Sequence, residues 1–126
     1  MVDRKKLEAR YKRQVVRKMK GVGTYNVSFM HTINVLAQVL ADYEETIEVF
    51  ERTGGQKVIK HTNKAGATNI IKNPLYQAIE KLRDDIITYS RELGLTPAGL
   101  KRINQEGAKP SKVSPLERVL AELGSK

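Results

Sequence analysis

The side chains that could do chemistry are few in this sequence, and they form no catalytic pattern. The chain has no cysteine, which excludes disulfides and thiolate zinc sites. Its two histidines, His31 and His61, are not accompanied by a carboxylate pair. No nucleophile motif, phosphate-binding glycine loop or metal-linked carboxylate pair occurs. We therefore predict that the protein is not an enzyme, holds no metal and no cofactor, and carries two ordinary polar histidines.

The chemistry that the sequence does favour is the neutralisation of a polyanion. The net charge is +9, and residues 1–20 contribute nine basic and two acidic side chains, or +7. A helix with cations on most of its surface can neutralise several phosphates and release their counterions. The candidate DNA-binding residues of this segment are Arg4, Lys5, Lys6, Arg10, Lys12, Arg13, Arg17, Lys18 and Lys20.

Two other interpretations of the basic segment remain open. Binding to a membrane surface needs a broad apolar face, and this segment offers only a narrow stripe. Alternatively, the stripe packs on the core and the cations serve solubility. Single-strand recognition by base stacking is disfavoured because aromatic residues make up only 6% of the chain.

Residues 1–23 are predicted to form a basic helical arm. Asp3 is a candidate N-cap, and glycines 21 and 23 are expected to end the helix in a flexible joint. The apolar residues recur every four positions, which predicts one narrow stripe: Leu7, Tyr11, Val15 and Met19.

A second helix is predicted from Val27 to Arg52. Its apolar residues alternate gaps of four and three, a spacing typical of a helix–helix seam, and a second side is also apolar. No residue from 21 to 41 is charged, so we expect another subunit to cover part of this helix. The predicted oligomer interface is Phe29, Met30, Ile33, Leu36 and Leu40.

The same helix carries an acidic stripe in its second half, which is either a solvated face or an electrostatic partner for neighbouring cations. Its members are Asp42, Glu44, Glu45, Glu48 and Glu51.

Two short β-like runs follow, at residues 57–61 and 68–71, around a turn that contains Gly66. They predict a β-hairpin. No acid lies between Glu51 and Glu80, so the hairpin forms a second, weaker basic surface. Its candidate DNA-binding residues are Lys57, Lys60, Lys64 and Lys72.

A third helix begins with Asn73 as N-cap and Pro74 at its first position. Its apolar residues repeat the four–three spacing, and Gly94 ends it. The second and third helices should pack antiparallel, because their seams match and a hairpin joins them. Thr96 and Pro97 start a short fourth helix that ends near residue 107.

The tail is predicted to be a linker followed by a short helix that starts at Ser114 and Pro115. An isolated helix of this length is marginal in water, so it either docks on a partner, which we favour, or adds a contact to the core. Its docking face is Leu116, Val119, Leu120 and Leu123.

These elements predict a mainly α protein: a long antiparallel helical hairpin with a small β-hairpin insertion, a basic N-terminal helix and a short C-terminal helix. The predicted regions are an arm at 1–23, an oligomerisation core at 24–106, and a linker with a docking helix at 107–126. No apolar run approaches the roughly 20 residues that span a bilayer, and no signal-peptide pattern opens the chain. We therefore expect a cytoplasmic protein with no membrane partner.

Several short motifs together resemble one group of bacteriophage terminase small subunits. They are the turn at residues 62–69, the helix start Asn73-Pro74, the helix stop at residues 93–97, and the ending from Ser114 onward. The resemblance covers about residues 40–126. It departs at residues 98–100, Ala-Gly-Leu, where the family usually has a serine and an arginine. The N-terminal region also differs, because it is proline-rich in many relatives and a basic helix here.

The resemblance implies a ring-forming protein that binds double-stranded DNA, recognises the packaging start on viral DNA and recruits the terminase large subunit, which holds the ATPase and nuclease. It would act in the cytoplasm of the infected bacterial host and be absent from the mature virion. Two alternatives stay open: a dimeric DNA-binding transcriptional regulator, and a structural adaptor whose cations only aid solubility.

Overall fold

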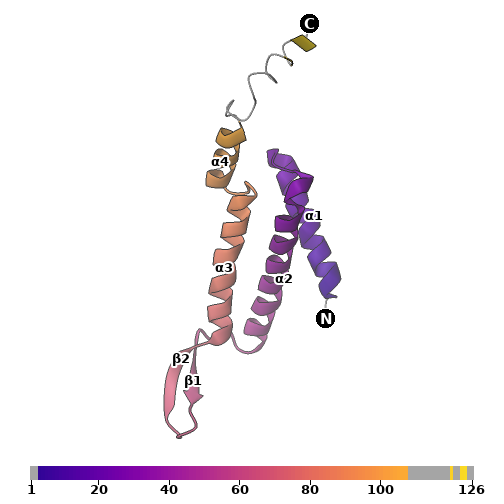
Figure 1. The fold of residues 1–126 in the computed structure, drawn as a ribbon. Helices are drawn as coiled ribbons and strands as arrows, with labels where there is room; N and C mark the ends of the chain where they lie inside the picture. The colour runs from indigo at the N-terminus through magenta and orange to yellow at the C-terminus, as the bar shows by residue number, and fades with distance from the viewer. Residues whose placement is uncertain (1–2, 108–119, 121–122, 125–126) are drawn as a thin grey trace.

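The protein is built from three long helices that lie side by side, as a computed structural model shows for residues 3–107, 120 and 123–124. The helices are α1 (Arg4–Val22), α2 (Met30–Arg52) and α3 (Pro74–Glu92), and a 3-10 turn, η1 (Val27–Phe29), precedes α2. Helix α2 lies between α1 and α3 (Figure 1). Because α2 and α3 run antiparallel, the predicted helical hairpin is confirmed.

Two smaller elements extend from opposite ends of this helical layer (Figure 1). Strands β1 (Val58–Thr62) and β2 (Thr68–Lys72) form an antiparallel hairpin between α2 and α3. Helix α4 (Pro97–Gly107) follows α3 at the other end. The mainly helical fold with a small β-hairpin was therefore predicted correctly. Of the predicted tail, Leu116 and Val119 lie outside the described residues.

Helix α1 is docked on α2, and of the two glycines predicted to end it only Gly23 does so. The helix continues through Gly21 and ends at Gly23, whose φ of 81° lies in the left-handed region that glycine adopts without strain. Asp3 caps its start by accepting a hydrogen bond from the Lys5 amide. Leu7, Val15 and Met19 of the predicted stripe are buried, so the stripe is a packing surface.

The residues of the predicted oligomer interface differ in their exposure in the single chain. Ile33 and Leu36 are buried, in one cluster with Val15, Met19 and Leu93. Met30 and Leu40 are half-buried against the same cluster. Only Phe29 of the five keeps an exposed side chain, at 39%. The interface stays a prediction.

Polar contacts tie the connections to this core. The Thr24 hydroxyl donates to the Leu93 carbonyl oxygen at 2.9 Å, which joins the α1–α2 connection to the end of α3. The Asn73 side chain caps α3 by accepting from the Leu75 amide at 3.0 Å. It also donates to the Gln56 carbonyl oxygen at 2.8 Å. Asn73 therefore links the base of the hairpin to the first turn of α3.

The sequence departs from the family pattern at residues 98–100, and Gly99 there has a structural reason. A Cβ atom at Gly99 would overlap the backbone carbonyl of Arg91. Helix α4 can lie against the last turn of α3 only because residue 99 has no side chain.

We predict that Gly99→Ala lowers the free energy of unfolding by about 1–3 kcal/mol, because the added methyl forces α4 away from α3. Gly21→Ala is the matched control: it lies within α1, its added methyl would have no neighbouring atom within 4 Å, and it should raise stability by up to about 1 kcal/mol. Urea unfolding followed by circular dichroism measures both. Equal effects of the two substitutions would contradict the close packing at Gly99.

Candidate nucleic-acid interface

The packing of α1 decides which of its cations face solvent. With 3.6 residues per turn, the side of the helix opposite the buried stripe carries residues spaced by alternating gaps of four and three. The five residues on that side are all basic and all exposed, and they extend over about 21 Å at 1.5 Å per residue. We call this set the basic ridge: Lys6, Arg10, Arg13, Arg17 and Lys20.

The remaining cations of α1 lie elsewhere on the helix. Lys5 and Lys18 are exposed and Lys12 is half-buried. Arg4 turns toward α2, where its guanidinium lies 2.8 Å from Asp42 and 3.1 Å from Glu45. Partial burial lowers the pKa of Arg4, but the hydrogen bonds to the two carboxylates outweigh this effect and raise it. Arg4 therefore joins α1 to α2 through these ion pairs.

Glu44 holds the middle of α1 in the same way. Its Oε1 atom accepts from Arg10 at 2.9 Å and from the Tyr11 hydroxyl at 3.0 Å. Burial raises the pKa of Tyr11, and the hydrogen bond to Glu44 raises it further. Of the two interpretations of the acidic stripe, the electrostatic partner therefore applies to Asp42, Glu44 and Glu45.

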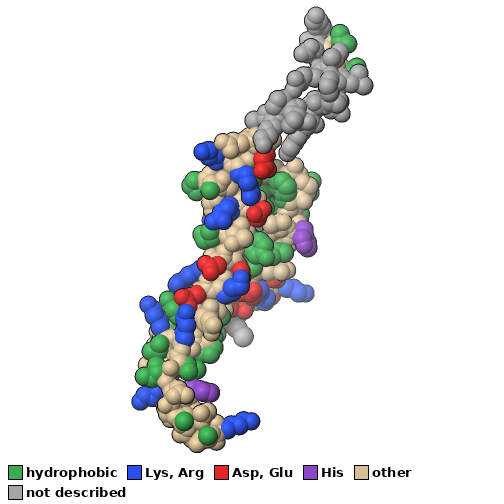
Figure 2. All heavy atoms as spheres, turned by 60° about the vertical axis from the view of Figure 1, so that its left-hand side comes forward, with side chains coloured by type: hydrophobic (Ala, Val, Ile, Leu, Met, Phe, Trp, Pro, Cys, Tyr) green, Lys and Arg blue, Asp and Glu red, His purple; other side chains and the backbone are tan. Residues whose placement is uncertain are grey.

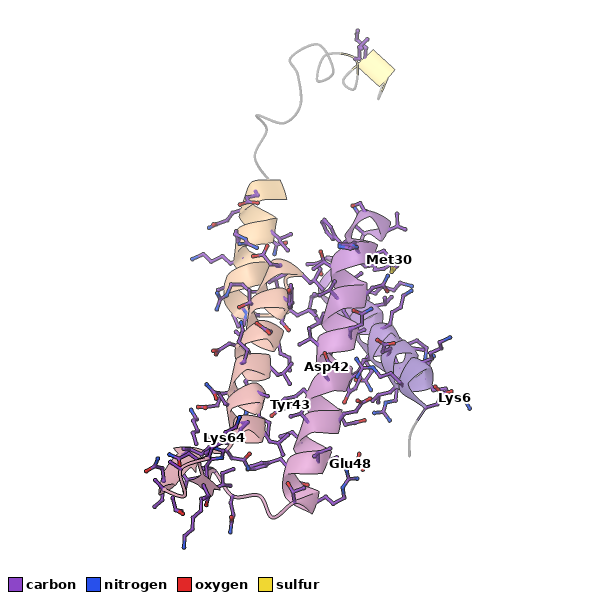
Figure 3. All side chains as sticks on the ribbon, turned by 60° about the horizontal axis from the view of Figure 1, so that its bottom comes forward. Lys6, Met30, Asp42, Tyr43, Glu48 and Lys64 are labelled. Carbon is purple, nitrogen blue, oxygen red and sulfur yellow. The ribbon has the colours of Figure 1, made fainter. Side chains whose placement is uncertain are left out.

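Figure 3 shows this division: Asp42 lies on α2 beside α1, whereas Lys6 lies on the side of α1 away from α2. Glu48 pairs within α2, 3.7 Å from Arg52. Exposed ion pairs each add at most about 1 kcal/mol. The pairs between α1 and α2 have the larger effect of orienting α1. Sequence analysis did not identify these pairs because the acids lie more than 30 positions from their partners. The available signal was the matching charge of the two stripes.

The four candidate lysines of the hairpin are exposed, and they differ in their surroundings. The Nζ atoms of Lys57 and Lys72 lie 5.4 and 5.7 Å from the centre of the Tyr76 ring. Lys72 also pairs with Glu80. Lys60 and Lys64 make no ion pair with the carboxylates that the structure describes. Tyr76, which sequence analysis did not select, is therefore a support for two of the hairpin lysines.

The structure does not join the two basic surfaces into one. The hairpin projects from one end of the helical layer (Figure 1), whereas the ridge lies on α1. In Figure 2, acidic side chains accompany the cations along α3, and none is seen on the hairpin. The predicted DNA-binding residues thus fall into a ridge, a hairpin set and a few inward or flanking cations.

The described residues include no group of three metal-ligating side chains. His31 lies at the start of α2 and His61 on β1, on separate elements. Within the same residues, no helix is both long and apolar enough to cross a membrane.

We predict that Tyr11 and Glu44 are energetically coupled. Tyr11→Phe should lower the free energy of unfolding by about 1 kcal/mol, because it removes a partly buried hydrogen bond to a charged acceptor. In a double-mutant cycle with Glu44→Gln, measured by urea unfolding, the two losses should not add. Glu51→Gln, an exposed acid on the same helix, is the control and should be additive with Tyr11→Phe. Full additivity of the Tyr11–Glu44 pair would contradict the contact.

Comparison with known proteins identifies the family of this chain. The family described as phage terminase, small subunit, matches residues 9–110. No curated protein and no solved structure matches the chain. The match includes most of α1, the helical hairpin, the β-hairpin and α4. Because it covers well over half of the sequence, the chain belongs to the phage terminase small subunits and has a role in phage DNA packaging.

Proposed function

We propose that this chain binds duplex viral DNA at the packaging start through the basic ridge and brings the terminase large subunit to it. The observation that carries the proposal is the ridge: five exposed cations on one side of a docked helix, of which Arg10 also pairs with Glu44. Each cation that meets a phosphate releases a condensed counterion, which is the main driving force of non-specific DNA binding.

The composition of the ridge favours duplex DNA over single strands. Stacking on bases needs exposed aromatic rings among the cations. The two tyrosines near the ridge are engaged: the Tyr11 hydroxyl donates to Glu44, and Lys20 lies over the Tyr25 ring at 5.0 Å. The ridge therefore offers charge to a backbone and no platform for a base.

We also propose that the chain assembles into a homo-oligomeric ring, in which many ridges act on one DNA together. The support is incomplete burial: no residue from Asp42 to Lys72 is buried. Phe29, Val22 and Ile87 are at least 39% exposed. Apolar surface of this kind in a small domain is typical of subunits that are covered by partners.

The tail is proposed to dock on the large subunit through the face predicted from sequence. Two residues of that face are described, Leu120 and Leu123, and they are 58% and 65% exposed. In this proposal the chain performs no chemistry itself, because the ATPase and nuclease belong to the large subunit. It acts in the cytoplasm of the infected bacterium and is left out of the mature virion.

The salt dependence of DNA binding tests the ridge. Neutralising about five phosphates predicts that log K falls with log salt at a slope near −4.5. Arg13→Gln with Arg17→Gln should reduce that slope by about 1.8, because two phosphate contacts are lost. Fluorescence anisotropy on a duplex of random sequence measures both slopes.

The control for this experiment is Arg91→Gln with Lys101→Gln, two exposed cations of α3 and α4, which should leave the slope unchanged. An equal reduction in both double variants would show that only total charge matters. The ridge would then lose its assigned role.

Native mass spectrometry tests the assembly. We expect a discrete, closed, higher-order oligomer, because the exposed apolar residues need a covering subunit. Phe29→Ser should shift it toward smaller species, with Leu120→Ser, on the exposed tail face assigned to the large subunit, as an equally apolar-to-polar control. A clean dimer that binds DNA would contradict the ring and favour a dimeric transcriptional regulator.

A further inference from the structure

The β-hairpin presents one face that the described part of the chain leaves exposed. Side chains alternate across a strand, so directly paired residues share a face. The pairs Val58–Lys72, Lys60–Ile70 and Thr62–Thr68 define what we call the outer face. All six of its residues are exposed, whereas Ile59 and Ile71 on the opposite face are half-buried. Apart from Lys72, which pairs with Glu80 of α3, the outer face is therefore left exposed by the described residues.

The outer face combines charge with apolar groups that lack a partner in the subunit. Ile70 is 73% exposed and Val58 is 57% exposed. They line a shallow hollow together with Gln56, Lys57, Lys60 and Ile59, the last from the opposite face. Binding of an acidic macromolecule would explain both the exposed apolar side chains and the positive charge of the outer face. Because the segment between Glu51 and Glu80 contains no acid, the charge of the hairpin complements a polyanion over its whole length.

We propose that the hairpin enters the major groove of DNA as a two-stranded ribbon and reads base edges with its outer face. This inference rests on the proposed function, which assigns affinity to the basic ridge; the hairpin would supply the sequence preference that phosphate contacts lack.

The dimensions and the chemistry of the hairpin fit that role. The major groove is about 12 Å wide and admits a two-stranded ribbon, whose strands lie about 4.8 Å apart. Each strand has five residues, which is about 17 Å of ribbon. The hairpin also projects clear of the helices (Figure 1), so a duplex can reach its outer face.

Each residue in the centre of the outer face matches a group in the groove. Lys60 can donate to the guanine acceptors, and Ile70 can contact the methyl group of thymine. The hydroxyls of Thr62 and Thr68 lie 3.1 Å apart and can rotate to donate to or accept from a base. Lys64 lies in the connecting turn (Figure 3) and can reach a flanking phosphate.

The turn is built to hold the two strands in this register. Asn63 Oδ1 accepts hydrogen bonds from the amides of Ala65 and Ala67, both at 3.0 Å. The backbone N–H of Asn63 donates to the Ala67 carbonyl oxygen at 3.0 Å. A fixed turn reduces the conformational entropy that the ribbon loses on binding.

The test is sequence selection with the full-length protein on duplexes whose central segment is randomised. We expect the wild type to enrich a sequence pattern, and Ile70→Ala to lower the preference for it about tenfold, the effect of one lost base contact. Ile87→Ala, which truncates an isoleucine that is 50% exposed on α3, is the matched control and should keep the preference.

A substitution in the DNA locates the contact. Replacing thymine by uracil in the enriched duplex removes a methyl group from the major groove. This should weaken binding by the wild type and leave Ile70→Ala unaffected. Lys64→Ala should lower the salt slope by about 0.9, because Lys64 is placed on a phosphate, whereas Lys101→Ala, which also removes one exposed lysine, should not.

Three results would overturn the inference. If Ile70→Ala and Lys60→Ala select the same sequences as the wild type, the hairpin does not read DNA. If they instead reduce the native mass, the outer face is a contact between subunits. If the wild type binds with a steep salt slope but enriches no sequence, the ridge keeps its assigned role in affinity and the hairpin does not read base edges. A wild type that binds no DNA would overturn both the ribbon and the proposed function.

Discussion

The docking of α1 on α2 is the interaction on which the rest of the structure depends. Leu7, Val15 and Met19 bury one side of a helix that otherwise consists largely of cations. Burying that side orients the basic ridge toward solvent, because the two sides of a helix are fixed relative to each other. The same contact covers Ile33 and Leu36 of α2. One packing contact therefore creates both the core and the candidate DNA surface.

Local features of the fold could be predicted from the sequence, because short-range chemistry determines them. Asp3 and Asn73 cap helices, and the hairpin forms where the β-like runs indicated. The predictions failed where the answer depends on which helix packs on which. Ile33 and Leu36 were assigned to a subunit contact because their helix is apolar on more than one side, and in the single chain they are buried with Val15 and Met19 of α1. Gly21 was taken for a break, yet its helical neighbours are held by tertiary packing, which overrides glycine's low propensity.

The sequence predicted which residues are basic in the candidate site, but not how those residues are arranged in space. The basic segment was identified from its charge, yet nothing in that charge separates Arg4, which pairs with Asp42 and Glu45, from Arg13, which lies on the ridge. The separation requires the position of the acidic stripe on α2. Similarly, charge predicted the hairpin lysines, whereas the exposure of Ile70 follows only from the strand register and from the absence of a covering element among the described residues.

The ion pairs between α1 and α2 also bear on how a docked helix can bind a polyanion. A helix on a flexible joint would lose conformational freedom on binding DNA, and a docked ridge has already lost it. Docking, however, brings the ridge close to the acids of α2, which would repel phosphates. Arg4 and Arg10 reduce that repulsion by pairing with Asp42, Glu44 and Glu45. Arg4 and the ridge residue Arg10 thus neutralise acids beneath the ridge, so that the other four ridge cations act on a solvent-facing side that remains positive.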